Sequence, residues 1–143
     1  MKLEEDNLGF LLTDVTRLLR RVAEKRLQGS SLTLSQARAL KYIAINEGVR
    51  QVELAELLEI QPMTLARQID LLAEAGLVER RPDPKDRRAH LIYLTEQADA
   101  QLEVIKQMSR GVRQDALAGL TDEQADILRF ALYHMHQNLA RLA

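Results

Sequence analysis

The stretch from Pro62 to Thr95 constrains the fold more than any other, because its hydrophobic period changes halfway along. In the first half, apolar residues recur at helical spacing, at Leu65, Ile69, Leu72 and Leu77. This spacing predicts a helix over residues 62–75 that buries one stripe and presents the opposite face. Gly76 is expected to end that helix, since glycine adopts the left-handed cap conformation without strain.

The second half of the stretch predicts a β-hairpin. Segments 77–81 and 90–94 are short and rich in branched side chains, which is typical of strands. Between and beside them, cations outnumber carboxylates: Arg80, Arg81, Lys85, Arg87 and Arg88 against Asp83 and Asp86. A presented helix followed by a basic hairpin fits two adjacent grooves of duplex DNA.

A second short helix is predicted just before the presented one, over residues 51–58. Two such helices separated by a brief turn indicate a helix-turn-helix. The short helix is expected to bury Val52, Leu54, Ala55 and Leu58, and the helix before it Leu34, Ala37, Leu40, Ile43 and Ala44. Val49 and Arg50 are too few to assign, although they could add a third strand.

The outer parts of the chain are predicted to be long helices. One runs from Asn7 to near Gly29, and another lies within residues 98–116 with Thr95 as its expected cap. Capping boxes are expected where a threonine is followed three residues later by glutamine, at Thr33 with Gln36 and at Thr121 with Gln124. The last helix follows the second of these boxes.

The predicted fold class is mainly α with a small antiparallel β wing. Residues 33–95 are expected to form a winged helix-turn-helix DNA-binding domain, and residues 1–32 and 96–143 a helical dimerisation region. The first and last helices each carry an apolar seam that the small middle domain cannot cover along its length. Burying one Leu or Val contributes about 1.5–3 kcal/mol, so we expect a second copy to cover both seams. The alternative is that the seams pack on each other within a monomer.

Composition excludes several classes of protein. A formal net charge of -1 argues against indiscriminate coating of nucleic acid, and the absence of cysteine excludes disulfides and thiolate chemistry. No carboxylate pair or serine has catalytic spacing, and His134 and His136 diverge on their helix. The start MKLEEDN lacks a signal-peptide pattern, and no apolar run approaches membrane-spanning length. We expect a cytoplasmic, non-enzymatic protein with no metal site and no cofactor.

Several motifs together resemble the MarR family of winged helix-turn-helix regulators, in particular its SlyA-like members. They are LAELL at 54–58, TLARQID at 64–70, GLVERR at 76–81 and DPKDRRAHLIYLT at 83–95. The resemblance implies a homodimeric transcriptional regulator, a repressor, that binds a pseudo-palindromic operator and is often released by a small anionic aromatic ligand. The sequence departs from the family pattern at Glu59 and Ala98, where relatives often have glycine, and at Leu71, where a basic or polar residue is common.

Four residues of the presented helix are candidate DNA contacts: Met63, Thr64, Arg67 and Gln68. Arg67 has the fork geometry that binds guanine O6 and N7, although it could instead pair with Asp70 or Glu74 along the helix. Thr64 and Gln68 are suited to thymine methyl groups or adenine edges. The bases that are read do not follow from one sequence.

Further candidate contacts lie on the wing and at the helix that Thr33 begins. Arg88 is expected to enter a narrow minor groove, with Arg87 as a phosphate contact or structural pair. Asp86 points the same way as Arg88 along a strand, so its carboxylate is expected to orient that arginine. At the helix start, backbone N–H groups with Ser35 or Gln36 are candidate phosphate contacts.

Regulation is left open by the sequence. In one interpretation a small anion binds between the arms and the DNA module, with Tyr42, Arg17 and Arg38 as unranked candidates. In another the protein needs no ligand and displaces a DNA-coating protein from promoters. A third class is a protein-binding adaptor that uses the winged module as a scaffold.

Overall fold

The computed structural model describes residues 7–143. Residues 1–6 lie outside it; they belong to the predicted dimerisation arm and to the N-terminal segment from which the localisation was inferred. Within that range the helices are α1 (Leu8–Leu27), α2 (Leu34–Ile45), α3 (Gln51–Leu58), α4 (Pro62–Glu74), α5 (Ala98–Ala116) and α6 (Asp122–Leu142). The strands are β1 (Val49–Arg50), β2 (Val78–Asp83) and β3 (Asp86–Leu94). No helix in this range is both long enough and apolar enough to cross a membrane.

The three strands form one antiparallel sheet in the order β1-β3-β2. The two-residue strand left unassigned from sequence pairs with β3, with Val49 opposite Ile92. The hairpin strands extend further towards the tip than predicted, so only Pro84 and Lys85 separate them. Pro82 is tolerated inside β2 because that strand lies at the edge of the sheet, where its missing N–H breaks no ladder.

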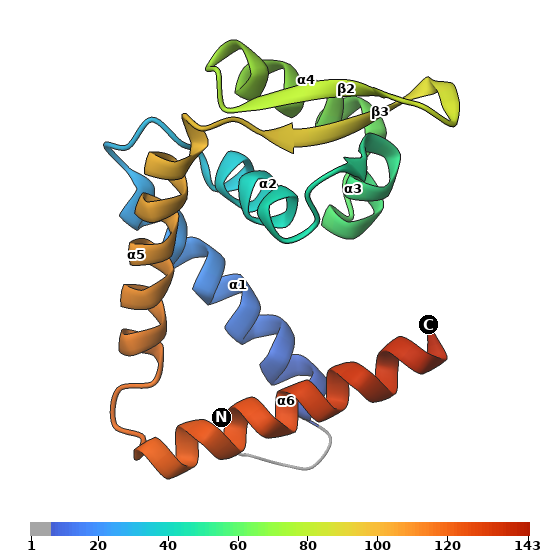
Figure 1. The fold of residues 1–143 in the computed structure, drawn as a ribbon. Coiled ribbons are helices and arrows are strands. Elements are labelled where there is room, and N and C mark those ends of the chain that lie inside the picture. Colours follow the sequence, from blue (N-terminus) through green and yellow to red (C-terminus); the bar gives the residue numbers. More distant parts are fainter. Residues whose placement is uncertain (1–6) are drawn as a thin grey trace.

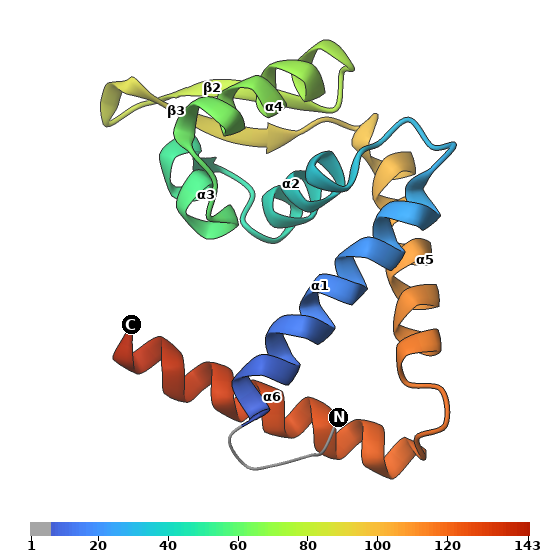
Figure 2. The ribbon, with the colours of Figure 1, turned by 180° about the vertical axis from the view of Figure 1, so that it is seen from behind.

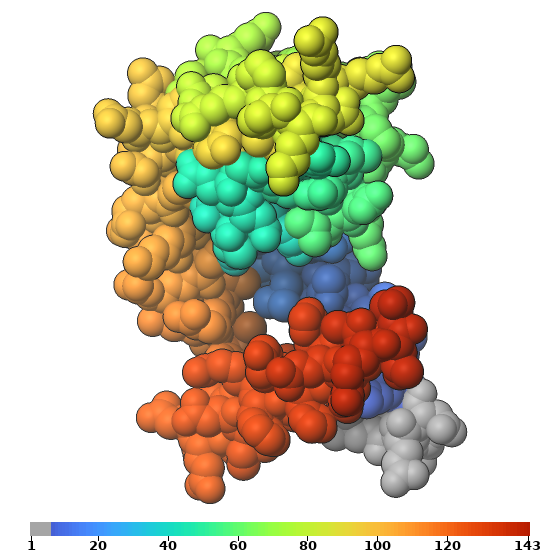
Figure 3. All heavy atoms as spheres, turned by 45° about the vertical axis from the view of Figure 1, so that its right-hand side comes forward, coloured from blue at the N-terminus to red at the C-terminus, as the bar shows by residue number. Residues whose placement is uncertain are grey.

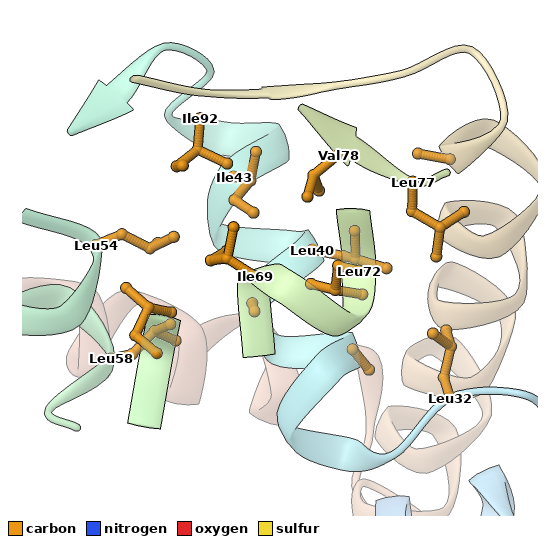
Figure 4. Close-up of a cluster of buried hydrophobic side chains, with 14 of the residues drawn as sticks. Leu32, Leu40, Ile43, Leu54, Leu58, Ile69, Leu72, Leu77, Val78 and Ile92 are labelled. Atoms are coloured by element: carbon orange, nitrogen blue, oxygen red, sulfur yellow. The ribbon is translucent and has the colours of Figure 1, made fainter. Parts of the chain in front are cut away.

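The core lies between the sheet and helices α2, α3 and α4 (Figure 4). Its largest fully buried side chains are Leu40, Ile43, Leu54, Leu65, Ile69, Leu72 and Ile92. The apolar stripe predicted for residues 62–75 therefore packs into the core. As a result, the opposite face of α4 points towards solvent. Two predicted core residues are wrong: Val52 and Ala44 are exposed, because each lies one position off the stripe that its helix turns to the core.

The long helices extend away from this core, to which α1 and α5 contribute Leu27, Ala98 and Ile105. Figures 1 and 2 show α1 and α5 descending from the α2–α4 unit, with α6 crossing below them. None of the residues of α6 is buried, and Figure 3 shows open space between α6 and the domain that carries the wing. The long helices therefore keep their apolar faces largely uncovered within one chain.

The helix ends follow the predicted chemistry with one exception. Both capping boxes are present, at Thr33 with Gln36 and at Thr121 with Gln124. Thr95 does not cap α5: Gln97 precedes that helix, and the Thr95 hydroxyl instead donates to the Gly76 carbonyl. This bond attaches the end of β3 to the end of α4, a long-range contact that a local capping pattern does not reveal.

Two left-handed residues frame the helix-turn-helix. Gly76 has φ +76 after α4, as predicted. Glu59 has φ 53 after α3, and Ile60 N–H donates to Ala55 O at 3.1 Å across that turn. A non-glycine residue in this conformation is strained by roughly 1 kcal/mol. The turn after α3 nevertheless keeps its left-handed geometry with a glutamate at this position.

Candidate nucleic-acid interface

Helix α4 presents the face that the sequence predicted. Pro62 occupies its first turn, where a missing N–H leaves no bond unmade. Met63, Thr64 and Arg67 are exposed. Arg67 forms no ion pair within residues 7–143, because the nearest candidate partner on its helix, Asp70, binds Arg80 instead. The guanidinium of Arg67 is therefore available to a ligand.

Gln68 differs from the other three candidates. Its side chain is half-buried, and its Oε1 atom is buried without a hydrogen-bond partner in the described part of the chain. A residue turned partly towards the protein offers less of its amide to a groove than Thr64 or Arg67 does. The presented surface of α4 is therefore centred on Met63, Thr64 and Arg67, with Gln68 at its edge.

Arg80 has a positioning role that sequence reasoning missed, since it was counted only as part of a basic tip. From β2 it donates through Nε to Gln51 Oε1 of α3 at 2.9 Å and through Nη2 to Ala66 O of α4 at 3.1 Å. Its Nη1 atom lies 2.7 Å from Asp70 Oδ1. One guanidinium thus joins the wing to both helices of the helix-turn-helix, which only the folded structure brings within reach.

Replacing Arg80 with lysine should reveal this role. A single ammonium group cannot reproduce three contacts from a planar fork, so we expect the free energy of unfolding to fall by about 1–3 kcal/mol. DNA affinity is expected to fall with it, since the wing and α4 lose their common brace. Thermal denaturation and a binding titration measure the two effects. Arg81→Lys is the matched control, and an equal effect there would contradict the assignment.

Arg81 lies on the outer surface of the wing. Its hydrogen bond with Glu79, together with the nearby negative charge, raises its pKa against the opposing effect of desolvation, and its guanidinium carbon lies 3.8 Å from the centre of the Tyr93 ring. These contacts hold Arg81 against β2 and β3. The residue is therefore a surface stabiliser of the hairpin rather than part of its free tip.

A buried carboxylate braces the wing where β2 enters the hairpin turn. Asp83 is buried, lies 2.8 Å from Arg50 of β1, and accepts the Lys85 N–H at the turn. This pair ties the third strand to the start of the tip. The sequence did not predict this ion pair between Arg50 and Asp83. The two residues are 33 positions apart, and only the order of the strands in the sheet makes them neighbours.

Arg87 and Arg88 are exposed at the tip, as predicted, and neither side chain forms an ion pair within residues 7–143. The expected mechanism for Asp86 is wrong in detail. Its Oδ1 atom accepts the backbone N–H of Arg88 at 2.9 Å, instead of holding the guanidinium. Asp86 thus shapes the backbone of the turn and leaves the Arg88 side chain unpaired.

At the start of α2, Ser35 is exposed while Gln36 is half-buried. The Oε1 atom of Gln36 accepts the Thr33 N–H in the capping box at 3.0 Å. Gln36 is thus held by its own helix, which leaves Ser35 as the more accessible of the two candidates. Taken together, these elements define a winged helix-turn-helix protein with an exposed helix face beside a cationic hairpin.

Comparison with known proteins agrees with that class. The model of the MarR family matches residues 30–89. Apo wild-type MarR from E. coli is 29% identical, with a TM-score of 0.81 over 90% of this chain and 95% of that chain. A mutant E. coli MarR complexed with operator DNA is 27% identical, with a TM-score of 0.74 over 94% of this chain and 99% of that one. A MarR transcriptional regulator from Methanosarcina mazei Go1 is 23% identical, with a TM-score of 0.87 over 97% and 100%, and shares the fold.

The chain is therefore similar to MarR-family transcription regulators both in residues 30–89 and in its whole fold. Its assignment to the SlyA-like branch stays a prediction.

Proposed function

We propose that this protein is a homodimeric, sequence-specific DNA-binding regulator of transcription that acts in the cytoplasm as a repressor on a pseudo-palindromic operator. The observation that carries the proposal is the pairing of an exposed Arg67 on α4 with unpaired Arg87 and Arg88 at the wing tip. A helix of this kind fits the major groove, and an arginine at a hairpin tip fits the narrow minor groove beside it. The operator complex of the related E. coli protein supports the same partner.

In the proposed domain organisation, residues 33–95 bind DNA, and residues 1–32 and 96–143 mediate dimerisation. Large apolar side chains are exposed along α1 at Leu8, Phe10, Val15, Leu18, Leu19 and Val22. Those exposed along α6 are Ile127, Leu128, Phe130, Leu132, Tyr133, Leu139 and Leu142. A concentration of exposed large apolar side chains on two helices is typical of an interface. A two-fold axis between such arms would present two α4 helices at one face, suited to half-sites roughly 34 Å apart.

The experiment that tests the proposal is footprinting of the purified protein on the DNA upstream of its own coding region. We expect two protected half-sites of related sequence separated by one helical turn, or about 10 base pairs centre to centre. Protection should weaken steeply as salt rises, because each phosphate contact releases counterions. Failure to protect any fragment at low salt would overturn the proposal and favour a protein-binding scaffold.

A small anionic aromatic ligand is proposed to release the operator. A cavity of about 600 Å³ between α1, α2, α5 and α6 is lined mainly by apolar side chains. The cations at its wall include Arg20, Arg38 and Lys41. Of the three candidates from sequence, Arg38 lines this cavity, whereas Arg17 pairs with Asp14 at 2.7 Å and Tyr42 packs against the core. An apolar space with convergent charge suits an amphipathic anion.

Benzoate is therefore expected to raise the melting temperature, while neutral benzamide is not. At a hundredfold excess over its Kd, a ligand stabilises the folded state by about 2.7 kcal/mol. Arg38→Gln should reduce the shift, and Arg17→Gln should leave it unchanged. Thermal shift measurements across both compounds and both variants test this. Equal shifts with the acid and the amide would exclude charge recognition by the cavity.

A further inference from the structure

The outward face of α4 carries two large apolar side chains on either side of Arg67. Met63 is 73% exposed and Leu71 is 54% exposed. Positions 63, 67 and 71 follow each other at steps of four, so their side chains lie one above the other on a single face of the helix. This face points away from Ile69 and Leu72, which are buried in the core (Figure 4).

Neither apolar side chain takes part in the packing of the domain. Within residues 7–143, Met63 and Leu71 belong neither to the hydrophobic core nor to the partly buried apolar residues packed against it. A single exposed leucine is ordinary on a protein surface. Here, however, the two apolar side chains flank the only arginine of α4. Both are therefore free to lose their contact with water when a ligand covers this face.

The carboxylates of α4 limit how far along the helix DNA can approach. Asp70 Oδ1 lies 2.7 Å from Arg80, so its charge is balanced by the wing. Glu74 is exposed in the last turn of the helix, three positions after Leu71. Phosphates repel a carboxylate, so α4 approaches a duplex most closely over the segment from Met63 to Leu71.

The chemistry of this face matches features of the major groove. The groove offers one apolar feature, the 5-methyl group of thymine, and guanine presents O6 and N7 acceptors that suit the fork of an arginine. The three side chains follow each other at about 6 Å along the helix axis, because an α-helix rises about 1.5 Å per residue. This distance corresponds to about two base-pair steps of roughly 3.4 Å. An apolar–cation–apolar face therefore fits a methyl–guanine–methyl pattern along the groove.

Building on the proposed function, we propose that Met63 and Leu71 each contact the 5-methyl group of a thymine, on opposite sides of the base pair that Arg67 reads. Each half-site of the operator then contains a guanine with a thymine about two base-pair steps away on either side, in either strand. Leu71 is thus a specificity residue at a position where the sequence departs from the family pattern. Its side chain recognises a methyl group and contributes no charge towards a phosphate.

Deoxyuridine in place of thymine tests the inference, because it removes only the methyl group and keeps the hydrogen-bonding atoms of the base. The base pair read by Arg67 is first located as the one whose substitution no longer affects the Arg67→Ala variant. Each thymine of the footprinted operator is then replaced in turn, and affinity is measured by fluorescence anisotropy. We expect the wild-type protein to bind about fourfold more weakly when either flanking methyl is absent, as suits the burial of one methyl group.

The variants Leu71→Ala and Met63→Ala assign each methyl group to a side chain. Each variant should lose the deoxyuridine penalty at one flanking thymine and keep it at the other. Both should fold as the wild-type protein does, because the truncated side chains are exposed. Ile45→Ala is the matched control, since Ile45 is 71% exposed but lies on α2, and it should keep both penalties.

The variant Leu71→Arg separates methyl recognition from a general change in affinity. Its salt dependence should be steeper by about one phosphate contact, while the deoxyuridine penalty at the thymine assigned to Leu71 disappears. A wild-type protein with no penalty at any thymine, or an unchanged penalty in both alanine variants, would overturn the inference while leaving DNA binding intact. The same conclusion follows if Arg67→Ala relaxes no base pair between the two thymines. Absence of binding by every version at low salt would overturn the proposed function as well.

Discussion

Replacing Arg67 with alanine is expected to weaken operator binding by about 1–3 kcal/mol, roughly fivefold to more than a hundredfold, and to relax base preference at one position of each half-site. The physical reason is that Arg67 is exposed on the presented face of α4 and has no ion pair within residues 7–143. Its donors are therefore not satisfied by the protein before DNA arrives. Titrations against the operator and against duplexes with single base changes measure both effects.

A variant of the wing arginine Arg88 serves as the comparison for the Arg67 prediction. Arg88→Ala should weaken binding with less loss of major-groove base preference, because an arginine in the minor groove senses width and potential more than base edges. Arg141→Ala, in the last turn of α6, removes the same charge far along the chain and should leave affinity nearly unchanged. If Arg67→Ala and Arg88→Ala both bound like the wild-type protein, the assigned roles would be refuted.

Introducing a charge into the apolar surface of α6, as in Leu139→Asp, is expected to separate the dimer into monomers. Leu139 is 60% exposed in the single chain, and burying a leucine contributes about 1.5–3 kcal/mol. A two-fold interface contains each residue twice, so the loss is about 3–6 kcal/mol. DNA affinity should fall with it, because two tethered helices bind adjacent half-sites far better than one.

Sedimentation velocity measures the mass of each variant in solution. Ile45→Asp is the informative control, because Ile45 is 71% exposed yet lies at the end of α2, outside the arms. We expect it to remain dimeric, which would show that position on the arms and not exposure alone decides assembly. A wild-type protein that sediments as a monomer, or a dimeric Leu139→Asp, would contradict the proposed interface.

Elements of this fold could be predicted from the sequence wherever the governing interactions are local. The capping boxes at Thr33 and Thr121 join residues three positions apart, and the stripe of α4 follows from a helical period over thirteen residues. The left-handed conformation at Glu59 falls at a position where the resemblance implies that relatives often have glycine. The failures have a common cause. Val52 and Thr95 were assigned by local pattern, whereas neighbouring elements decided their surroundings.

The candidate site divides in the same way. Exposure of Met63, Thr64 and Arg67 follows from the helix period, and exposure of the tip arginines from the hairpin turn. Asp86 was correctly placed on one strand with Arg88 but with the wrong partner, because strand alternation predicts direction and not which donor lies within reach. The half-burial of Gln68 depends on how closely the rest of the domain packs beside α4.

The sequence by itself determined where the helices and the hairpin lie, which face of α4 is buried, and where the positive charge gathers. These are consequences of periodicity and of contacts within about one helical turn. Only the tertiary structure decided that Arg80 braces the wing against two helices and that Arg50 meets Asp83. Such contacts join residues that are distant in the chain, so their existence depends on how whole elements pack and not on the pattern within any one of them.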